Sequence, residues 1–131
     1  RLLAFALDGT ARLPAVDRAD TSVRALDDPA MKLVEADVQA GAGLFVGCSL
    51  CHGKDVVAGG TAPDLRESAL TLDADAFRSV VRGGALLQNG MPRFETLTDA
   101  ELRQLRAYIR ARARTALGKR DEGPGSQPAR F

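Results

Sequence analysis

Residues 48–54 read CSLCHGK, and they hold both cysteines and the only histidine of this 131-residue chain. Thiolate and imidazole are the side chains that bind transition metals best. The chain places all of them within five consecutive positions, with Cys48 and Cys51 three residues apart and His52 directly after the second thiol. The chemistry that needs this arrangement decides the fold as well as the function.

Four kinds of site use a Cys-x-x-Cys pair: a thioredoxin-type redox dithiol, half of a zinc site, a small disulfide loop and the attachment point of a c-type haem. A structural zinc site needs four ligands, and no fourth cysteine or histidine exists here. A redox dithiol expects a strand before the motif, whereas a helical pattern precedes it. A disulfide across two residues closes too short a loop to stabilise the fold much.

Cys-x-x-Cys-His is the signature of covalent haem attachment. Two thiols at this spacing can reach the two vinyl groups on one edge of the porphyrin, and the next residue then points its imidazole at the iron. The sequence therefore predicts one haem c, joined to Cys48 and Cys51 and ligated by His52. Such a flat apolar group would also fill the centre of a domain that has few apolar residues to spare.

The absence of a second histidine leaves a methionine, a lysine, an amine terminus or an open site for the sixth iron ligand. Met91 stands in the loop sequence LLQNGMPRF, where Asn-Gly before it and Pro after it favour a loop conformation. Met31 precedes the motif and the first predicted helix. We expect Met91 to be the ligand and Met31 to fill core space.

Helical periodicity indicates three helices. The first covers residues 32–47, where the apolar positions Val34, Val38, Ala42 and Phe45 share a face with Gly41. The second begins after Asp73 as N-cap, with Leu72 and Phe77 as hydrophobic staple, and stops at Gly83-Gly84. The third begins at a capping box of Thr98 and Glu101, and its buried stripe is Leu102, Leu105, Ile109 and Ala113.

Three segments follow from this pattern. Residues 1–30 look like a connector that opens with an apolar burst, residues 31–117 form the domain, and residues 118–131 read as a polar, flexible tail. Long loops at 53–70 and 83–96 separate the helices, and no alternating strand is evident. We therefore predict an all-α fold of about three to five helices wrapped around one covalently bound haem c.

The charge is nearly balanced, with 18 basic and 17 acidic residues and a formal net charge of +1. Nucleic-acid-binding proteins normally carry a clear basic excess. No apolar run approaches the roughly 18 residues that cross a bilayer. We expect a monomer that neither spans a membrane nor binds nucleic acid.

At these residues the sequence resembles the class I cytochrome c family over residues 31–117. The matching features are Gly41 and Phe45, the CSLCH motif, APDL at 62–65, GMPRF at 90–94 and Tyr108. The resemblance implies that the first and last helices cross at Gly41 and that the Pro63 carbonyl accepts a hydrogen bond from the His52 imidazole. It also implies that Leu65 and Phe94 contact the haem and that Met91 ligates it.

A narrower resemblance links the opening LLAFALDGTARLP and the run from Gly59 to Phe94 to quinohaemoprotein alcohol dehydrogenases. Those enzymes carry a pyrroloquinoline-quinone (PQQ) β-propeller followed by a cytochrome c domain. The resemblance implies that residues 1–13 are a last propeller strand and that PQQ belongs to a preceding domain absent from this sequence. The chain alone would then be an electron carrier and not an enzyme.

These expectations combine into one function. The domain would accept electrons from the reduced PQQ domain of a dehydrogenase and pass them to a redox protein or quinone acceptor, in the periplasm, where haem is joined to c-type cytochromes. The alternatives are a stand-alone c-type cytochrome and a haem sensor or peroxidase with an open sixth site. A haem-free redox dithiol is a further alternative.

Arginines form the remaining motif. The cluster Arg103, Arg106, Arg110, Arg112 and Arg114 on the last predicted helix favours a solvated face near the helix C-terminus, with a docking site as the second interpretation. Arg66 or Arg93 could neutralise a haem propionate by a charge-assisted hydrogen bond.

Overall fold

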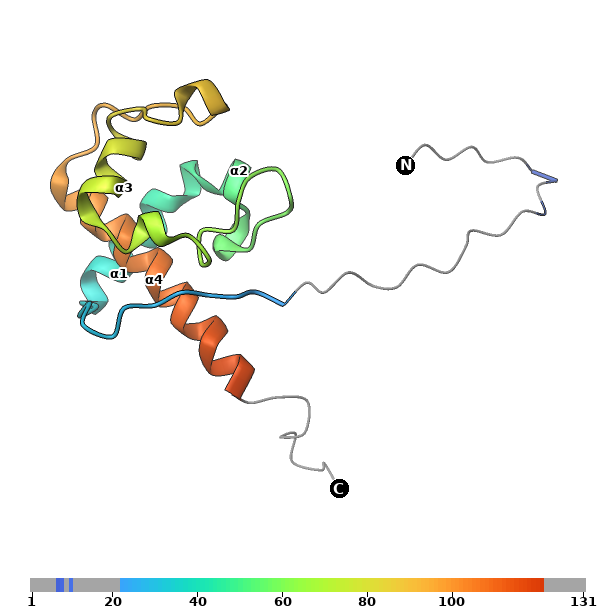
Figure 1. Ribbon diagram of the computed structural model, residues 1–131, viewed down its shortest axis with the longest axis horizontal. Coiled ribbons are helices and arrows are strands. Elements are labelled where there is room, and N and C mark those ends of the chain that lie inside the picture. Colours follow the sequence, from blue (N-terminus) through green and yellow to red (C-terminus); the bar gives the residue numbers. More distant parts are fainter. Residues whose placement is uncertain (1–6, 9, 11–21, 122–131) are drawn as a thin grey trace.

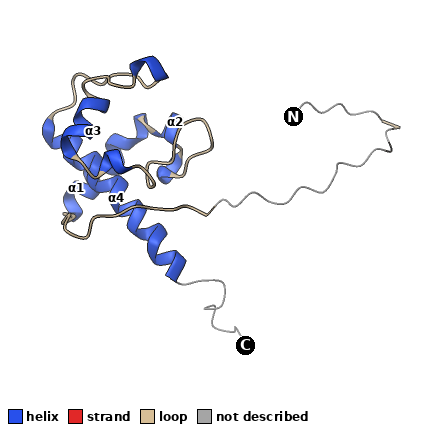
Figure 2. Ribbon diagram, in the orientation of Figure 1, coloured by secondary structure: helices blue, strands red, loops and turns tan. Residues whose placement is uncertain are grey.

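The computed structural model describes residues 7–8, 10 and 22–121. This part of the chain contains helices and loops but no strand, which confirms the predicted all-α fold (Figure 2). The α-helices are α1 (Glu35–Leu44), α2 (Ser49–His52), α3 (Ala74–Val81) and α4 (Asp99–Asp121), and short 3₁₀ turns cover Phe45–Gly47, Lys54–Val56, Ala69–Thr71 and Leu87–Asn89. Most of the strand predicted at 1–13 lies outside the described residues.

The long helix α4 crosses α1, and the crossing depends on Gly41 (Figure 1). A Cβ atom at Gly41 would lie 2.0 Å from the Gln104 carbonyl oxygen and 2.9 Å from the Tyr108 Cβ, so only glycine lets the two backbones approach this closely. One turn further on, the Phe45 and Tyr108 rings contact each other with centroids 5.4 Å apart. The expected crossing at Gly41 and its aromatic neighbours is therefore present.

The first helix is shorter than predicted. It begins after Val34, which is 57% exposed, and it gives way to a 3₁₀ turn at Phe45, so only Gly41 and Phe45 of the predicted stripe are buried. The motif then lies on a separate short helix, α2, and not at the end of α1. A helix of 32–47 was wrong because the chain must turn at 45–47 to direct the motif along a new axis.

The starts of α3 and α4 follow the predicted caps. The Asp73 carboxylate accepts hydrogen bonds from the backbone N–H groups of Asp75 and Ala76. At α4 the Thr98 N–H donates to the Glu101 carboxylate over 2.8 Å, and the Glu101 N–H donates back to the Thr98 hydroxyl over 3.2 Å. Both arrangements satisfy N–H groups that a helix start leaves unpaired.

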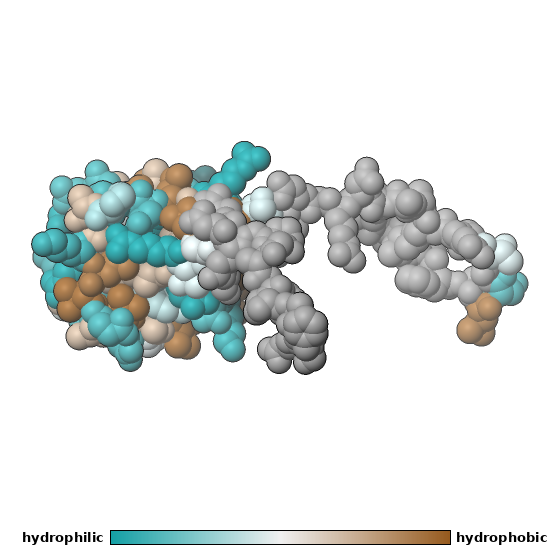
Figure 3. Space-filling view, turned by 90° about the horizontal axis from the view of Figure 1, so that it is seen from below, coloured by the Kyte–Doolittle hydropathy of each residue, from teal (hydrophilic) through white to brown (hydrophobic). Residues whose placement is uncertain are grey.

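One apolar cluster joins α1, α3 and α4. Its buried members are Phe45, Val56, Phe77, Val81, Leu102, Leu105 and Ile109. The predicted α4 stripe is confirmed, because Leu102, Leu105, Ile109 and Ala113 are each at most 4% exposed. On the outside, the face shown in Figure 3 mixes hydrophilic and hydrophobic residues.

Residues 22–31, called the N-terminal strap from here on, lie along the second half of α4. Ala25 packs against Ala113 and Ala116 in a second, smaller apolar cluster. Helix α4 continues to Asp121, four residues beyond the predicted end of the domain at 117. Among the residues that the structure describes, no helix is both long enough and apolar enough to cross a bilayer.

Candidate haem site

The CSLCH motif occupies one helical turn. Cys48 is the N-cap residue of α2, and the N–H groups of Cys51 and His52 both donate to the Cys48 carbonyl. Both thiols are free; Cys48 is half-buried and Cys51 is exposed. Burial raises the pKa of the Cys48 thiol, and the nearby Cys51 raises it further. Redox dithiols work through a lowered thiol pKa, so this environment does not favour the dithiol interpretation.

The His52 imidazole is buried and held from one side. Its Nδ1 lies 3.1 Å from the Pro63 carbonyl oxygen, the contact implied by the family resemblance. Because a carbonyl only accepts, Nδ1 carries the proton in this contact and Nε2 keeps its lone pair. No described residue donates to Nε2. This is the arrangement in which an imidazole binds a metal through one nitrogen and is oriented through the other.

The backbone directly after α2 adopts unusual conformations. Gly53 has φ 78° and ψ 154°, a conformation open essentially to glycine alone. Asp55 (φ 57°) and Val56 (φ 62°) follow in the left-handed region, although Val56 is β-branched and fully buried. Contacts from α4 hold this turn: the Tyr108 hydroxyl lies 3.4 Å from the Asp55 carboxylate, and Arg112 Nε donates to the Asp55 carbonyl over 3.2 Å.

The segment after Pro63 is also fixed. The Asp64 carboxylate accepts from the backbone N–H of Arg66 and, through both oxygens, from its guanidinium at 2.9 and 2.6 Å. Burial alone would raise the pKa of Asp64, but the hydrogen bonds and charge of Arg66 together hold it below its ordinary value. Arg66 is therefore engaged within its own loop, and Arg93 pairs with Glu95. Each arginine thus has an acidic partner, and a contact of either one with a haem propionate stays a prediction.

Met91 lies in the second long loop, after Gly90, which has φ 90°. The Met91 side chain is partly buried against the main apolar cluster, and so are those of Cys48, Leu65 and Phe94. The Phe94 N–H donates to the Val81 carbonyl at the end of α3, which ties this loop to the core. Met31 belongs to neither apolar cluster and contributes its carbonyl to Arg114, which differs from the expectation that it fills the core.

The donor set and its surroundings fit a haem c. Two thiols, an imidazole with Nε2 available and a thioether are present, and four of the predicted site residues share contacts with one apolar cluster. Apolar side chains stay exposed on the 3₁₀ turn before α2, on α2 and on both loops: Val46, Leu50, Val57 and Leu87 are 71, 90, 50 and 51% exposed. No three His, Cys, Asp or Glu side chains of the described segment gather as a zinc site would require.

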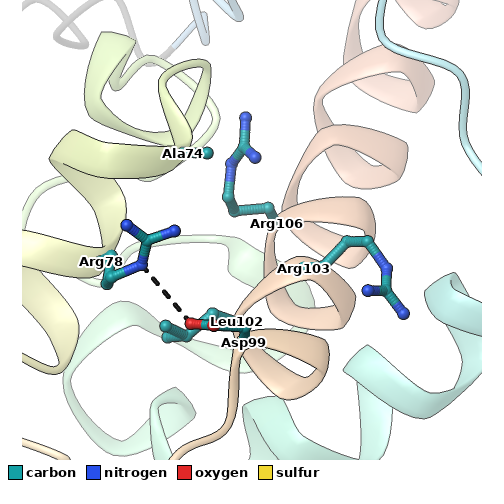
Figure 4. Close-up of a pocket in the computed structure, with 6 residues that line it drawn as sticks. All are labelled: Ala74, Arg78, Asp99, Leu102, Arg103 and Arg106. Carbon is teal, nitrogen blue, oxygen red and sulfur yellow. Dashed lines mark ion pairs between the residues drawn. The ribbon is translucent and has the colours of Figure 1, made fainter.

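A small pocket elsewhere does not compete with this site. It has a volume of about 50 Å³ and lies between α3 and α4, where Arg78 Nε is 3.5 Å from the Asp99 carboxylate (Figure 4). Its lining is Ala74, Arg78, Asp99, Leu102, Arg103 and Arg106. This volume holds a water molecule or two and not a macrocycle.

The arginine cluster of α4 is not the solvated face that the sequence indicated. Arg106 donates to the carbonyls of Thr71 and Leu72, and Arg114 binds the Asp27 carboxylate and the carbonyls of Asp28 and Met31. Arg110 is fully buried. Four of the five arginines thus tie loops to α4, and only Arg103, which pairs with Asp37, stays mostly exposed.

Sequence reasoning placed Arg110 on a solvated face and missed the strained turn at Asp55-Val56. Arginines whose partners are backbone carbonyls have no sequence signature, because every residue has a carbonyl. The turn had a weak signal: glycine directly after the motif marks a point where the chain needs an unusual φ.

Comparison with known proteins agrees with this geometry. The family described as cytochrome C oxidase, cbb3-type, subunit III matches residues 36–109. Quinohemoprotein alcohol dehydrogenase ADH IIB of Pseudomonas putida is 40% identical over 114 residues, which cover 86% of this chain and 16% of that protein. The dehydrogenase subunit of alcohol dehydrogenase (quinone) of Gluconobacter oxydans is 35% identical over 116 residues, 86% of this chain and 15% of that protein.

Lupanine 17-hydroxylase [cytochrome c] of a Pseudomonas species is also similar, with 36% identity over 120 residues. The chain spans only about a sixth of the length of these relatives, so the similarity concerns one part of each. The family match covers more than half of the chain and includes the CSLCH motif, Pro63 and Met91. The chain therefore belongs to the cytochrome c family and is a cytochrome c domain.

Proposed function

We propose that this domain binds one haem c and relays single electrons. Cys48 and Cys51 would form the thioether links, and His52 and Met91 would be the axial ligands. Pro63 orients His52, while Leu65 and Phe94 supply apolar contacts. The observation that carries the proposal is the His52 ring: buried, fixed through Nδ1, with Nε2 left available one residue after a pair of free thiols.

A haem c held in this way supplies one-electron exchange at its iron. The residues of the chain set the conditions for that exchange. The Met91 thioether, a weak donor, would favour the reduced state of the iron, and the apolar side chains around it would favour the state of lower charge. If His52 and Met91 both ligate the iron, no position would remain for a substrate, which would favour electron transfer over the sensor or peroxidase alternative.

The electron donor would be the PQQ-containing part of a dehydrogenase. The similarity to quinohemoprotein alcohol dehydrogenases supports this assignment. PQQ would then bind in another domain, the acceptor would be a redox protein or a quinone, and the compartment would be the periplasm. On this proposal residues 31–117 carry electrons and catalyse no alcohol oxidation themselves.

Two measurements test the haem assignment. The chain is produced in a host that exports it and attaches haem, and its intact mass is determined. We expect the added mass of one haem and, in the oxidised protein, the absorption band of a methionine–iron bond. A chain without added mass would be a haem-free protein, and a haem-loaded chain without the band would have an open sixth site.

Replacing Met91 with Ala tests the sixth ligand. We expect a lower reduction potential and binding of carbon monoxide, because the weak sulfur donor is lost and the iron position opens. Met31→Leu is the matched control, since the hydrogen bonds of Met31 are made by its backbone N–H and carbonyl and its side chain belongs to neither apolar cluster. A Met91→Ala protein with the potential and the carbon monoxide behaviour of its parent would contradict the assignment.

A further inference from the structure

Arg110 is 0% exposed, which is rare for an arginine. Within the described segment it forms no ion pair: its two terminal nitrogens donate to the carbonyls of Leu26 and Leu65, and its Nε has no partner. Asp27 contributes favourable charge but pairs with Arg114. Burying a guanidinium against carbonyls alone is costly. We therefore expect the structural role of Arg110 to lie in the two carbonyl groups that it binds.

These two carbonyls belong to different parts of the chain. Leu26 is in the N-terminal strap, and Leu65 is two residues after Pro63, whose carbonyl contacts His52. The strap and the loop are also bonded to each other, because the Leu26 N–H donates to the Arg66 carbonyl over 2.8 Å. Arg110 thus connects the strap and the loop after Pro63 to the same position of α4.

The other contacts of this loop are internal, to the strap or apolar: the Arg24 N–H donates to the Glu67 carboxylate, and Leu65 packs against the main apolar cluster. Residues 58–61 before Pro63 include two glycines, and Pro63 itself is exposed. The Asp64–Arg66 pair shapes the loop internally but does not attach it to a helix. In the described structure, the attachment to α4 at this point is the hydrogen bond from Arg110 to Leu65.

We propose that Arg110 is a positioning residue for His52, acting through the Leu65 and Pro63 carbonyls, and that the N-terminal strap is part of the same support. The inference rests on the proposed function, since it concerns the ligand side of the haem. A second partner that orients a metal-bound imidazole commonly decides both its geometry and its basicity. Arg110 does not contact His52 itself; it fixes the loop that carries the Pro63 carbonyl, and this carbonyl orients the imidazole.

The test uses the haem-loaded chain and two substitutions. Arg110→Lys keeps the positive charge but cannot donate to the Leu26 and Leu65 carbonyls with two separate nitrogens. Its effect therefore measures the loss of these contacts and not the loss of charge. Arg110→Met removes both. Arg103→Met is the matched control, because Arg103 lies on the same helix and binds Asp37 of α1, away from the loop.

Two readouts are taken: the exchange rate of the His52 Nδ1 proton in the reduced holoprotein, by proton NMR, and the reduction potential. For Arg110→Lys we expect exchange about tenfold faster, as for the loss of one hydrogen bond from a charged donor, together with a shifted potential. Arg110→Met is expected to exchange faster still, and Arg103→Met to behave as the parent protein. A general loss of stability would not single out this one proton.

Haem-loaded Arg110→Lys protein with the parental exchange rate and potential would overturn the inference and leave the proposed function intact. An Arg103→Met protein that changes as much as Arg110→Lys would overturn it too. If Arg110→Met does not fold, the measurements on Arg110→Lys alone test the inference. A chain that carries no haem at all, as determined by its intact mass, would instead overturn the proposed function and this inference with it.

Discussion

Two glycines, Gly41 in the α1–α4 crossing and Gly53 at the start of the loop after His52, are required for different reasons. Gly41 has ordinary helical geometry and is needed because another backbone lies against it. Gly53 is needed for its own backbone conformation, φ 78°, and a Cβ there would meet the Val57 carbonyl oxygen at 1.8 Å. The crossing is thus specified by packing between distant segments, and the loop by local backbone geometry.

The crossing should be the more sensitive region. Gly41→Val places a branched side chain where even a Cβ lies 2.0 Å from the Gln104 carbonyl, and neither backbone can move without separating the helices. We expect a loss of about 3 kcal/mol in the free energy of unfolding, at the upper end for an overpacked site. Urea denaturation of the purified chain measures it.

Gly43→Ala is the control in the same helix. A Cβ at Gly43 meets nothing within 4 Å, so the change should stabilise the chain by roughly 0.5–1 kcal/mol through helix propensity. If Gly41→Val and Gly43→Ala had similar effects, the close approach of α1 and α4 would not be what stabilises the crossing.

A substitution at Gly53 should lower the free energy of unfolding less than Gly41→Val does, and it should disturb the position of His52 more. For Gly53→Ala we expect a loss of roughly 2 kcal/mol, because the new side chain would occupy a backbone region that belongs to glycine and the Val57 backbone, four residues further on, would have to shift away from its Cβ. Because Gly53 directly follows His52, the contact between the imidazole and Pro63 should weaken as well. The His52 ring proton, observed by NMR, reports this directly.

Gly59→Ala in the same loop supplies the comparison. Gly59 has no positive φ and open space around its Cβ position, so its replacement should change stability by less than about 0.5 kcal/mol. An unchanged His52 signal in Gly53→Ala would show that the turn is not needed to place the imidazole.

The same contrast explains what the sequence could predict. The caps at Asp73 and Thr98 and the apolar stripe of α4 follow from local spacing, and all three are present. Gly41 in the apolar stripe suggested a close helix crossing, but the family resemblance was needed to identify the last helix as its partner, because a glycine does not say which element lies against it. Arg110 and Arg114 were misread as surface residues, since a hydrogen bond to a backbone carbonyl leaves no pattern in the partner's sequence.

The smallest effect is expected within the loop itself, at the ion pair of Asp64 and Arg66. Both side chains are mostly buried, at 18 and 15% exposure, and Arg66 holds the pKa of Asp64 below its ordinary value. A lowered folded pKa means that this pair stabilises the fold above the unfolded pKa of about 4, and that the contribution is lost as the pH falls through the folded pKa.

Asp64→Asn should therefore cost about 1 kcal/mol at neutral pH, and the difference from the parent protein should shrink as the pH is lowered from about 4 to about 2. Unfolding followed by circular dichroism across this range gives both values. Glu95→Gln is the control, because the Arg93–Glu95 pair is largely exposed, with side-chain exposures of 49 and 61%. A constant difference between Asp64→Asn and its parent at all pH values would mean that the carboxylate acts by shape, as a hydrogen-bond acceptor for the Arg66 N–H, and not by charge.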